Sequence, residues 1–152
     1  MIIKYNTEID DFYKTILVKE KEIDYGNDLL SMPYNVVSML NEVFRMGHLA
    51  EEYCYLLCMN NNSRVIGIFE IGHGTVHTAI VSTRDIFMKA LMVGASAIVI
   101  AHNHPSGDPS PSEKDILLYK KIKQASDLMN VDLLDFIIVG RCQYLSFSEA
   151  KL

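Results

Sequence analysis

The sequence lacks two features that define broad classes of protein. It has no excess of positive charge, because 14 Lys and Arg against 19 Asp and Glu give a formal net charge of −5. Sequence-independent binding to nucleic acid needs many basic side chains, so we expect no tight nucleic-acid partner beyond a local basic groove. It also has no apolar run at its start, where charges interrupt MIIKYNTEIDDFYK. This pattern predicts neither a signal peptide nor a membrane span, and hence a cytoplasmic protein.

Cysteine is also scarce, with only Cys54, Cys58 and Cys142 in the chain. The number is odd and the surroundings are apolar and strand-like, which favours reduced, buried thiols over disulfides. Cys54 and Cys58 do not have the C-x2-C spacing of a zinc knuckle. We therefore expect no cysteine-based zinc site.

What the sequence does contain is enough apolar material for one domain with one sizeable core: 152 residues, 49% hydrophobic, without repeats. A half-exposed strand is predicted at residues 15–23, and residues 1–14 are the one candidate for a loose tail. Apolar spacing predicts three helices, starting near Pro33, Thr83 and Pro111. It also predicts six further strands, at residues 52–59, 64–71, 76–81, 97–102, 133–139 and 144–147. This is the pattern of an α/β protein with a mixed sheet.

The helix ends carry recognisable signals. Pro33 suits the first turn of its helix, and Gly47 suits a position past the end. Ser82 or Thr83 suits the N-cap of the second helix, with Gly94 near its end. The strands at 52–59 and 64–71 are separated by a short NNNS turn, so we expect them to form a hairpin.

Chemistry is suggested by the stretch AHNHPSGDPSPSEKD, which follows the apolar run ASAIVI. Side chains two apart on a strand point to the same face, so His102 and His104 can meet while Asn103 faces away. Pro105 favours an extended conformation for His104. A catalytic zinc site takes three protein ligands and leaves a fourth position for water, so two convergent imidazoles supply most of one.

Asp115 is the candidate third ligand, but it also has a structural interpretation. Ser112 and Asp115 have the S-x-x-D spacing of a capping box at a helix start. Ser110 and Glu113 form a better box, because Pro111 would then occupy the first helical position. If Ser110 is the cap, Ser112 and Asp115 lie three apart on one helical face and are free to point at the histidines.

A metal-bound water also needs a carboxylate outside the ligand set to take its proton. Glu70 is the only acid in the strand RVIGIFEIG and precedes a loop with two glycines, Gly72 and Gly74. The alternative interpretation is a solvent-facing glutamate at the end of a strand.

Together these residues resemble the JAMM (MPN+) metalloprotease signature, E…H-x-H-P-x6-S-x2-D, and the wording HNHPSGDPSPSEKD resembles its RadC-like branch. The resemblance extends over residues 52–147. It implies a three-layer α-β-α fold like that of cytidine deaminase, with residues 33–152 as the domain and residues 1–32 as an N-terminal extension. It further implies a zinc ion on His102, His104 and Asp115, with Glu70 as general acid/base and Ser112 bonding the reacting oxygen. The expected activity is hydrolysis of peptide or isopeptide bonds in a peptide or protein substrate.

Some features depart from the resemblance. Asn103 stands where deubiquitinating members have Ser or Thr, which argues against ubiquitin-type substrates, and Phe136 stands where RadC-like proteins often have His. No helix-hairpin-helix pattern precedes Pro33, so nothing visible supports the DNA-repair label of the family. The competing hypothesis is a non-enzymatic or DNA-associated accessory module with a structural or vestigial metal site. All five signature positions are present, which favours the hydrolase.

Overall fold

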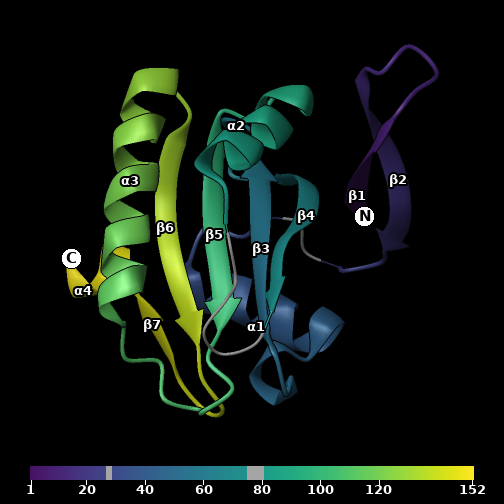
Figure 1. The fold of residues 1–152 in the computed structure, drawn as a ribbon. Coiled ribbons are helices and arrows are strands. Elements are labelled where there is room, and N and C mark those ends of the chain that lie inside the picture. The colour runs from purple at the N-terminus through teal and green to yellow at the C-terminus, as the bar shows by residue number, and fades with distance from the viewer. Residues whose placement is uncertain (27–28, 75–80) are drawn as a thin grey trace.

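A mixed seven-stranded sheet forms the centre of the computed structural model, which describes residues 1–26, 29–74 and 81–152 (Figure 1). The strand order across the described sheet is β2-β1-β4-β3-β5-β6-β7. The β1–β4 and β5–β6 contacts are parallel and the others are antiparallel. The strands are β1 (Ile2–Ile9), β2 (Thr15–Ile23), β3 (Glu52–Met59), β4 (Val65–Gly74), β5 (Ala97–Asn103), β6 (Asp132–Val139) and β7 (Tyr144–Ser146).

Helices cover both faces of this sheet, as Figure 1 shows. Helix α1 (Pro33–Phe44), followed by the short 3-10 helix η1 (Met46–His48), packs on one face. Helices α2 (Thr83–Met92), α3 (Glu113–Met129) and α4 (Phe147–Ala150) pack on the other. Strand alternation divides the core accordingly, because Leu57 of β3 contributes to the α1 cluster and Leu56 to the α2/α3 cluster. The predicted three-layer α/β arrangement is confirmed.

Most predicted elements are found within a few residues of their expected ends. Strand β3 spans residues 52–59 as predicted, and it pairs with β4 as a hairpin. Ser82 caps α2, because its side chain accepts a hydrogen bond from the backbone N–H of Asp85. Gly47 lies past the end of α1 as predicted, but the left-handed C-cap is Arg45, with φ 53°, two residues earlier. Residues 76–80 of the strand predicted at 76–81 lie outside the described part of the chain.

The prediction of a loose tail at residues 1–14 is wrong. Strand β1 lies between β2 and β4, and Lys4 is directly opposite Ile68 of β4. The physical reason is burial, because Ile2 is fully buried and pairs with Ile23 in the α1 cluster. The predicted extension therefore adds a hairpin to the main sheet.

The three cysteines are free thiols, as expected, but they differ in burial. Cys54 and Cys58 are buried in β3, and burial raises the pKa of the Cys58 thiol to about 12. Cys142 is exposed, contrary to prediction, because it lies in the turn between β6 and β7. In the described part of the chain, no helix is both long and apolar enough to cross a membrane.

Candidate metal centre

The two histidines lie at the carboxyl end of β5, and their imidazole rings are neighbours, tilted by 58° with centroids 5.0 Å apart. His102 is opposite Cys54 in the sheet and therefore on the α2/α3 face. Asn103 points away, as predicted: its Oδ1 accepts a hydrogen bond from the Tyr53 N–H at 2.7 Å, and its Nδ2 donates to the Glu51 carbonyl at 2.9 Å. The side chain of Asn103 thus ties β5 to β3, away from the histidines.

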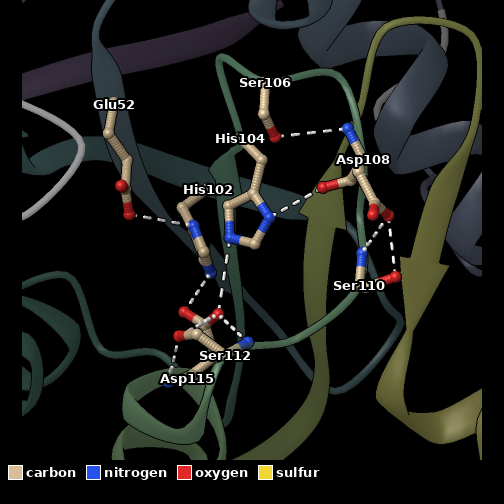
Figure 2. Close-up of polar contacts among 8 residues, drawn as sticks. All are labelled: Glu52, His102, His104, Ser106, Asp108, Ser110, Ser112 and Asp115. Carbon is tan, nitrogen blue, oxygen red and sulfur yellow. Dashed lines mark hydrogen bonds and ion pairs between the residues drawn. The ribbon is translucent and has the colours of Figure 1, made fainter.

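Asp115 reaches both histidines from the first turn of α3 (Figure 2). Its Oδ1 lies 3.0 Å from His102 Nε2, and its Oδ2 lies 3.4 Å from His104 Nε2. One ligand atom from each residue lies within 4.8 Å of the others. Ligands about 2.1 Å from a tetrahedral ion are about 3.4 Å apart, so these donors are close to the spacing of a shared metal.

Ser112, and not Ser110, caps α3. The Ser112 Oγ accepts from the Asp115 N–H at 3.2 Å, while Asp115 Oδ2 accepts from the N–H and the hydroxyl of Ser112, both at 2.7 Å. The predicted cap Ser110 instead donates its N–H and hydroxyl to Asp108 in a local turn. Capping and metal binding are not exclusive at Asp115, because the same carboxylate completes the capping box and lies against both imidazoles. The capping box holds the carboxylate against the imidazoles.

The loop that follows β5 is fixed by close contact with the β6–β7 turn. The His104 N–H donates to the Val139 carbonyl at 2.9 Å, and the Arg141 N–H donates to the Gly107 carbonyl at 3.1 Å. A side chain at Gly140 would place its Cβ 2.4 Å from that Gly107 carbonyl. Gly107 itself has φ +88°, a conformation that favours glycine. These contacts keep His104 in register with His102.

The protonation pattern of His104 suits a metal ligand. Its Nδ1 lies 2.9 Å from the Asp108 carbonyl, which only accepts, so Nδ1 carries the hydrogen. In a neutral ring this leaves the lone pair on Nε2, the atom that faces Asp115. A hydrogen-bonded second ring nitrogen is the usual arrangement in a ligating histidine.

Contacts between the carboxylates and the imidazoles shift the pKa values of the cluster. Burial alone would lower the pKa of His102, but the carboxylates of Asp115 and Glu52 outweigh it and raise that pKa to about 9. Burial likewise favours a raised pKa for Asp115, but the adjacent imidazoles of His102 and His104 hold that pKa well below its usual range. The site therefore holds an ionised Asp115 carboxylate next to positively charged imidazole. A bound metal cation would supply the same positive charge beside that carboxylate.

The residues present fit a divalent metal. Both ring nitrogens of His102 are buried and lack a well-directed hydrogen-bond partner among the described residues, although carboxylate oxygens lie 3.0 Å and 3.2 Å away. Buried polar atoms are almost always satisfied, and an ion bound at Nε2 would satisfy this one. Two imidazoles and one carboxylate form a donor set that zinc accepts.

Glu52 is a site residue that the sequence reasoning missed. It begins β3 two residues before Cys54, so its side chain lies on the same face as His102. Its Oε1 is 3.2 Å from His102 Nδ1, and its side chain is 17% exposed (Figure 2). Strand alternation puts Glu52 and Cys54 on one face, but only the pairing of β3 with β5 brings that face to the histidines.

Glu70 is not brought to the cluster. It is opposite Tyr55 in the β3–β4 pairing, and Tyr55 stacks on Phe44 of α1 with ring centroids 4.5 Å apart. Glu70 therefore lies on the α1 face of the sheet, opposite to His102. The ionic partner that the structure shows for it is Lys4, whose Nζ is 3.8 Å away. The predicted acid/base role of Glu70 has no support in this geometry.

Phe136 forms part of the packing beneath the site. Its side chain is fully buried and meets the His102 ring edge-on, with centroids 5.5 Å apart. It also contacts Phe147 of α4 edge-on at 5.0 Å. The residue that replaces the expected histidine thus packs against a candidate ligand from the core side.

Comparison with known proteins agrees with this geometry. Residues 30–152 match the family model described as the RadC-like JAB domain. The UPF0758 protein of Carboxydothermus hydrogenoformans is 40% identical over 109 residues, which cover 72% of this chain and 48% of that protein. UPF0758 proteins of Clostridium novyi and Clostridium botulinum are 35% and 38% identical over 124 and 125 residues, in each case 82% of this chain and 54% of the relative. The chain spans about half the length of these relatives, and their names state no activity.

Proposed function

We propose that this chain, which belongs to the RadC-like JAB domain family, is a zinc-dependent hydrolase of peptide or isopeptide bonds. The observation that carries the proposal is the convergence of His102, His104 and Asp115, with Glu52 beside them. Three protein ligands are the number found in catalytic zinc sites, whereas structural sites use four. Family membership supports a metal-dependent hydrolase. The choice of zinc and of the amide bond rests on the donor set and on the JAMM resemblance.

The proposed reaction needs metal ligands and a separate proton acceptor, and different residues supply them. His102, His104 and Asp115 would hold the ion, which supplies a Lewis acid for the scissile carbonyl and lowers the pKa of a bound water. Glu52 is the carboxylate outside this ligand set, on the same face as the histidines. We assign it to take a proton from the attacking water and return it to the leaving amine.

We assign Ser112 to positioning. Its hydroxyl already donates to Asp115 Oδ2 at 2.7 Å and accepts from the Asp115 N–H at 3.2 Å. The hydroxyl thus acts as donor to the Asp115 carboxylate and as acceptor for the Asp115 backbone, and both bonds fix the position of Asp115. This differs from the direct contact with the reacting oxygen that the family resemblance implied.

We also propose a substrate class and a cellular location for the protein. A peptide or protein substrate follows from the bond type, and the net charge of −5 argues against nucleic acid as a tight partner. We keep a cytoplasmic location as a prediction. Asn103 bonds the backbone of β3, so its identity reports on strand pairing more directly than on substrate choice.

Metal content and cleavage test the proposal together. We expect about one zinc per chain after reconstitution, with circular dichroism unchanged after chelation, because the apolar clusters on both sheet faces do not depend on the metal. The zinc-loaded protein should cleave members of a peptide and isopeptide library, and Asp115→Asn should bind zinc more weakly. A protein that stays metal-free would refute the site. Unfolding on chelation would make the site structural, and a loaded protein without hydrolytic activity would refute the enzyme.

A further inference from the structure

Asn103, between the two candidate ligand histidines, directs its side-chain amide away from them and onto β3. Its Oδ1 accepts a hydrogen bond from the Tyr53 N–H at 2.7 Å, and its Nδ2 donates to the Glu51 carbonyl at 2.9 Å. Only 1% of Asn103 is exposed. The two partners are the residues immediately before and after Glu52. One buried amide therefore holds the backbone on both sides of that glutamate.

This amide continues the contact between β3 and β5 beyond the point where their backbone pairing ends. The last pair in the described register of the two strands is Cys54 opposite His102. Glu52 lies two residues further along, and the described register pairs it with Gly74 of β4 alone. A side-chain amide offers the same kinds of donor and acceptor as a peptide unit. Asn103 therefore replaces, at the start of β3, the backbone groups with which β5 would otherwise hold it.

The start of β3 also carries the carboxylate that lies beside the metal cluster. Glu52 Oε1 is 3.2 Å from His102 Nδ1 (Figure 2). His102 directly precedes Asn103 in β5, so one strand carries both a candidate ligand and the amide that holds β3. We propose that Asn103 is a positioning residue that sets the place of Glu52 relative to the metal ligands. The inference rests on the proposed function, in which Glu52 accepts the proton of the attacking water.

The position requires a side chain that donates and accepts at the same time. Asparagine supplies an N–H donor toward the Glu51 carbonyl and a carbonyl acceptor toward the Tyr53 N–H. Aspartate has the same shape but no donor, and its charge repels the Glu51 carbonyl. Alanine supplies neither group. Since backbone groups away from water are almost always paired, either change should let the start of β3 shift toward other partners and carry Glu52 with it.

Ser126 of α3 offers a matched control, because it holds a strand in the same way at a distance from the metal cluster. It is 2% exposed, and its hydroxyl donates to the Val131 carbonyl at 2.7 Å and accepts from the Leu133 N–H at 2.9 Å. These partners flank Asp132, the first residue of β6. Strands β5 and β6 are parallel, so the start of β6 lies at the end of the sheet opposite to the histidines. Ser126→Ala should lower stability and leave the metal site unchanged.

Nuclear magnetic resonance of the metal-free protein tests the positioning without relying on catalysis. In wild type and in Ser126→Ala, we expect a nuclear Overhauser effect between the side chain of Glu52 and the ring of His102. Asn103→Ala and Asn103→Asp should both lose it. Asn103→Ala should also speed hydrogen exchange at the Tyr53 amide by about tenfold or more, because that N–H loses its acceptor. Asn103→Asp keeps this acceptor and the side-chain shape, so it serves as the test if the alanine variant does not fold.

Turnover at saturating zinc tests whether Asn103 acts through Glu52. Misplacing a reacting group by about 1 Å can cost about 100-fold, so Asn103→Ala and Asn103→Asp should each lower kcat by about 10-fold to 100-fold, with KM little changed. In the Glu52→Gln background, the same changes should lower kcat by no more than about twofold, because the group that Asn103 positions is already lost. Ser126→Ala should turn over like wild type in both backgrounds.

The outcomes separate this inference from the proposed function. Losses from Asn103 and Glu52 that simply multiply would show that Asn103 acts elsewhere, and would overturn the inference while the hydrolase stands. The inference is also overturned if both Asn103 variants keep the Overhauser effect between Glu52 and His102. A wild-type protein that binds zinc and cleaves nothing would refute the hydrolase, and the resonance measurements would still decide whether Asn103 holds Glu52 in place.

Discussion

The two faces of the sheet use glutamates in opposite ways. On the α2/α3 face, Glu52 lies 3.2 Å from His102 and is 17% exposed. On the α1 face, Glu70 lies 3.8 Å from Lys4 and is 34% exposed. The two residues sit on neighbouring strands of one hairpin, Glu52 on β3 and Glu70 on β4, and both are carboxylates capable of accepting a proton. The difference is the direction in which each side chain points.

This comparison shows that residue type and strand membership do not define a proton-transfer group. Glu70 follows Phe69, which belongs to the α2/α3 cluster, so alternation sends the Glu70 side chain to the other face. There, Lys4 lies between Glu70 and Glu20 and joins the β1–β2 hairpin to the rest of the sheet. Glu70 thus contributes to the attachment of the hairpin, and Glu52 contributes to the environment of the histidines.

The largest expected effect separates the two glutamates by activity. Glu52→Gln keeps the size of the side chain but cannot accept a proton, so turnover should fall by about 100-fold to 10,000-fold while zinc content is retained. Glu70→Gln is the matched control and should turn over within a few-fold of wild type. Both variants are measured for zinc content and for rate on a substrate of the wild-type protein. A larger loss of turnover in Glu70→Gln than in Glu52→Gln would contradict the assignment of Glu52 as the proton acceptor.

A smaller effect separates two helix caps, one at the metal site and one away from it. Ser112→Ala removes the hydroxyl that bonds Asp115, so zinc affinity should fall by about 10-fold to 100-fold. Ser82→Ala removes the equivalent cap of α2 and should cost about 1 kcal/mol of folding free energy with zinc affinity unchanged. Competition with a chromogenic chelator gives the affinities, and urea denaturation gives the stabilities. Equal zinc affinities in the two variants would argue that the capping box does not orient the ligand.

The smallest effect concerns the α1 face alone. Lys4→Met keeps an unbranched apolar side chain but leaves the carboxylates of Glu20 and Glu70 without their shared cation, so we expect a loss of about 1 kcal/mol. Lys123→Met removes an exposed lysine paired with Asp127 on α3 and should cost no more than about 0.5 kcal/mol. Denaturant midpoints of the two variants decide this, with zinc content as the check that the metal face is intact. A Lys4 variant as stable as wild type would show that this ion pair does not hold the hairpin.

Local patterns in the sequence predicted much of the fold and most of the metal cluster. The H-x-H spacing succeeded because a strand repeats every two residues, whatever the rest of the chain does. The capping-box interpretation of Ser112 and Asp115 is confirmed, whereas the preferred Ser110–Glu113 box is wrong, since Ser110 is held by Asp108 and Ser112 takes the cap. The prediction of a loose tail at residues 1–14 failed because the frequent charges there gave no apolar pattern of a strand. The burial of this strand depends on its pairing with β4, which the sequence alone does not show.

The sequence by itself determined which side chains share a face of each strand and where α3 can begin, because these depend on backbone geometry over a few residues. It therefore put His102 and His104 on one face and Asp115 in the first turn of α3, while their contact depends on the packing of α3 against the sheet. Only the tertiary structure decided which glutamate stands beside them, because that depends on how β3 pairs with β5 and β4, including the register shift between Cys54 and Tyr55. Strand pairing joins residues as far apart as Glu52 and His102, and its register is set by the packing of whole faces.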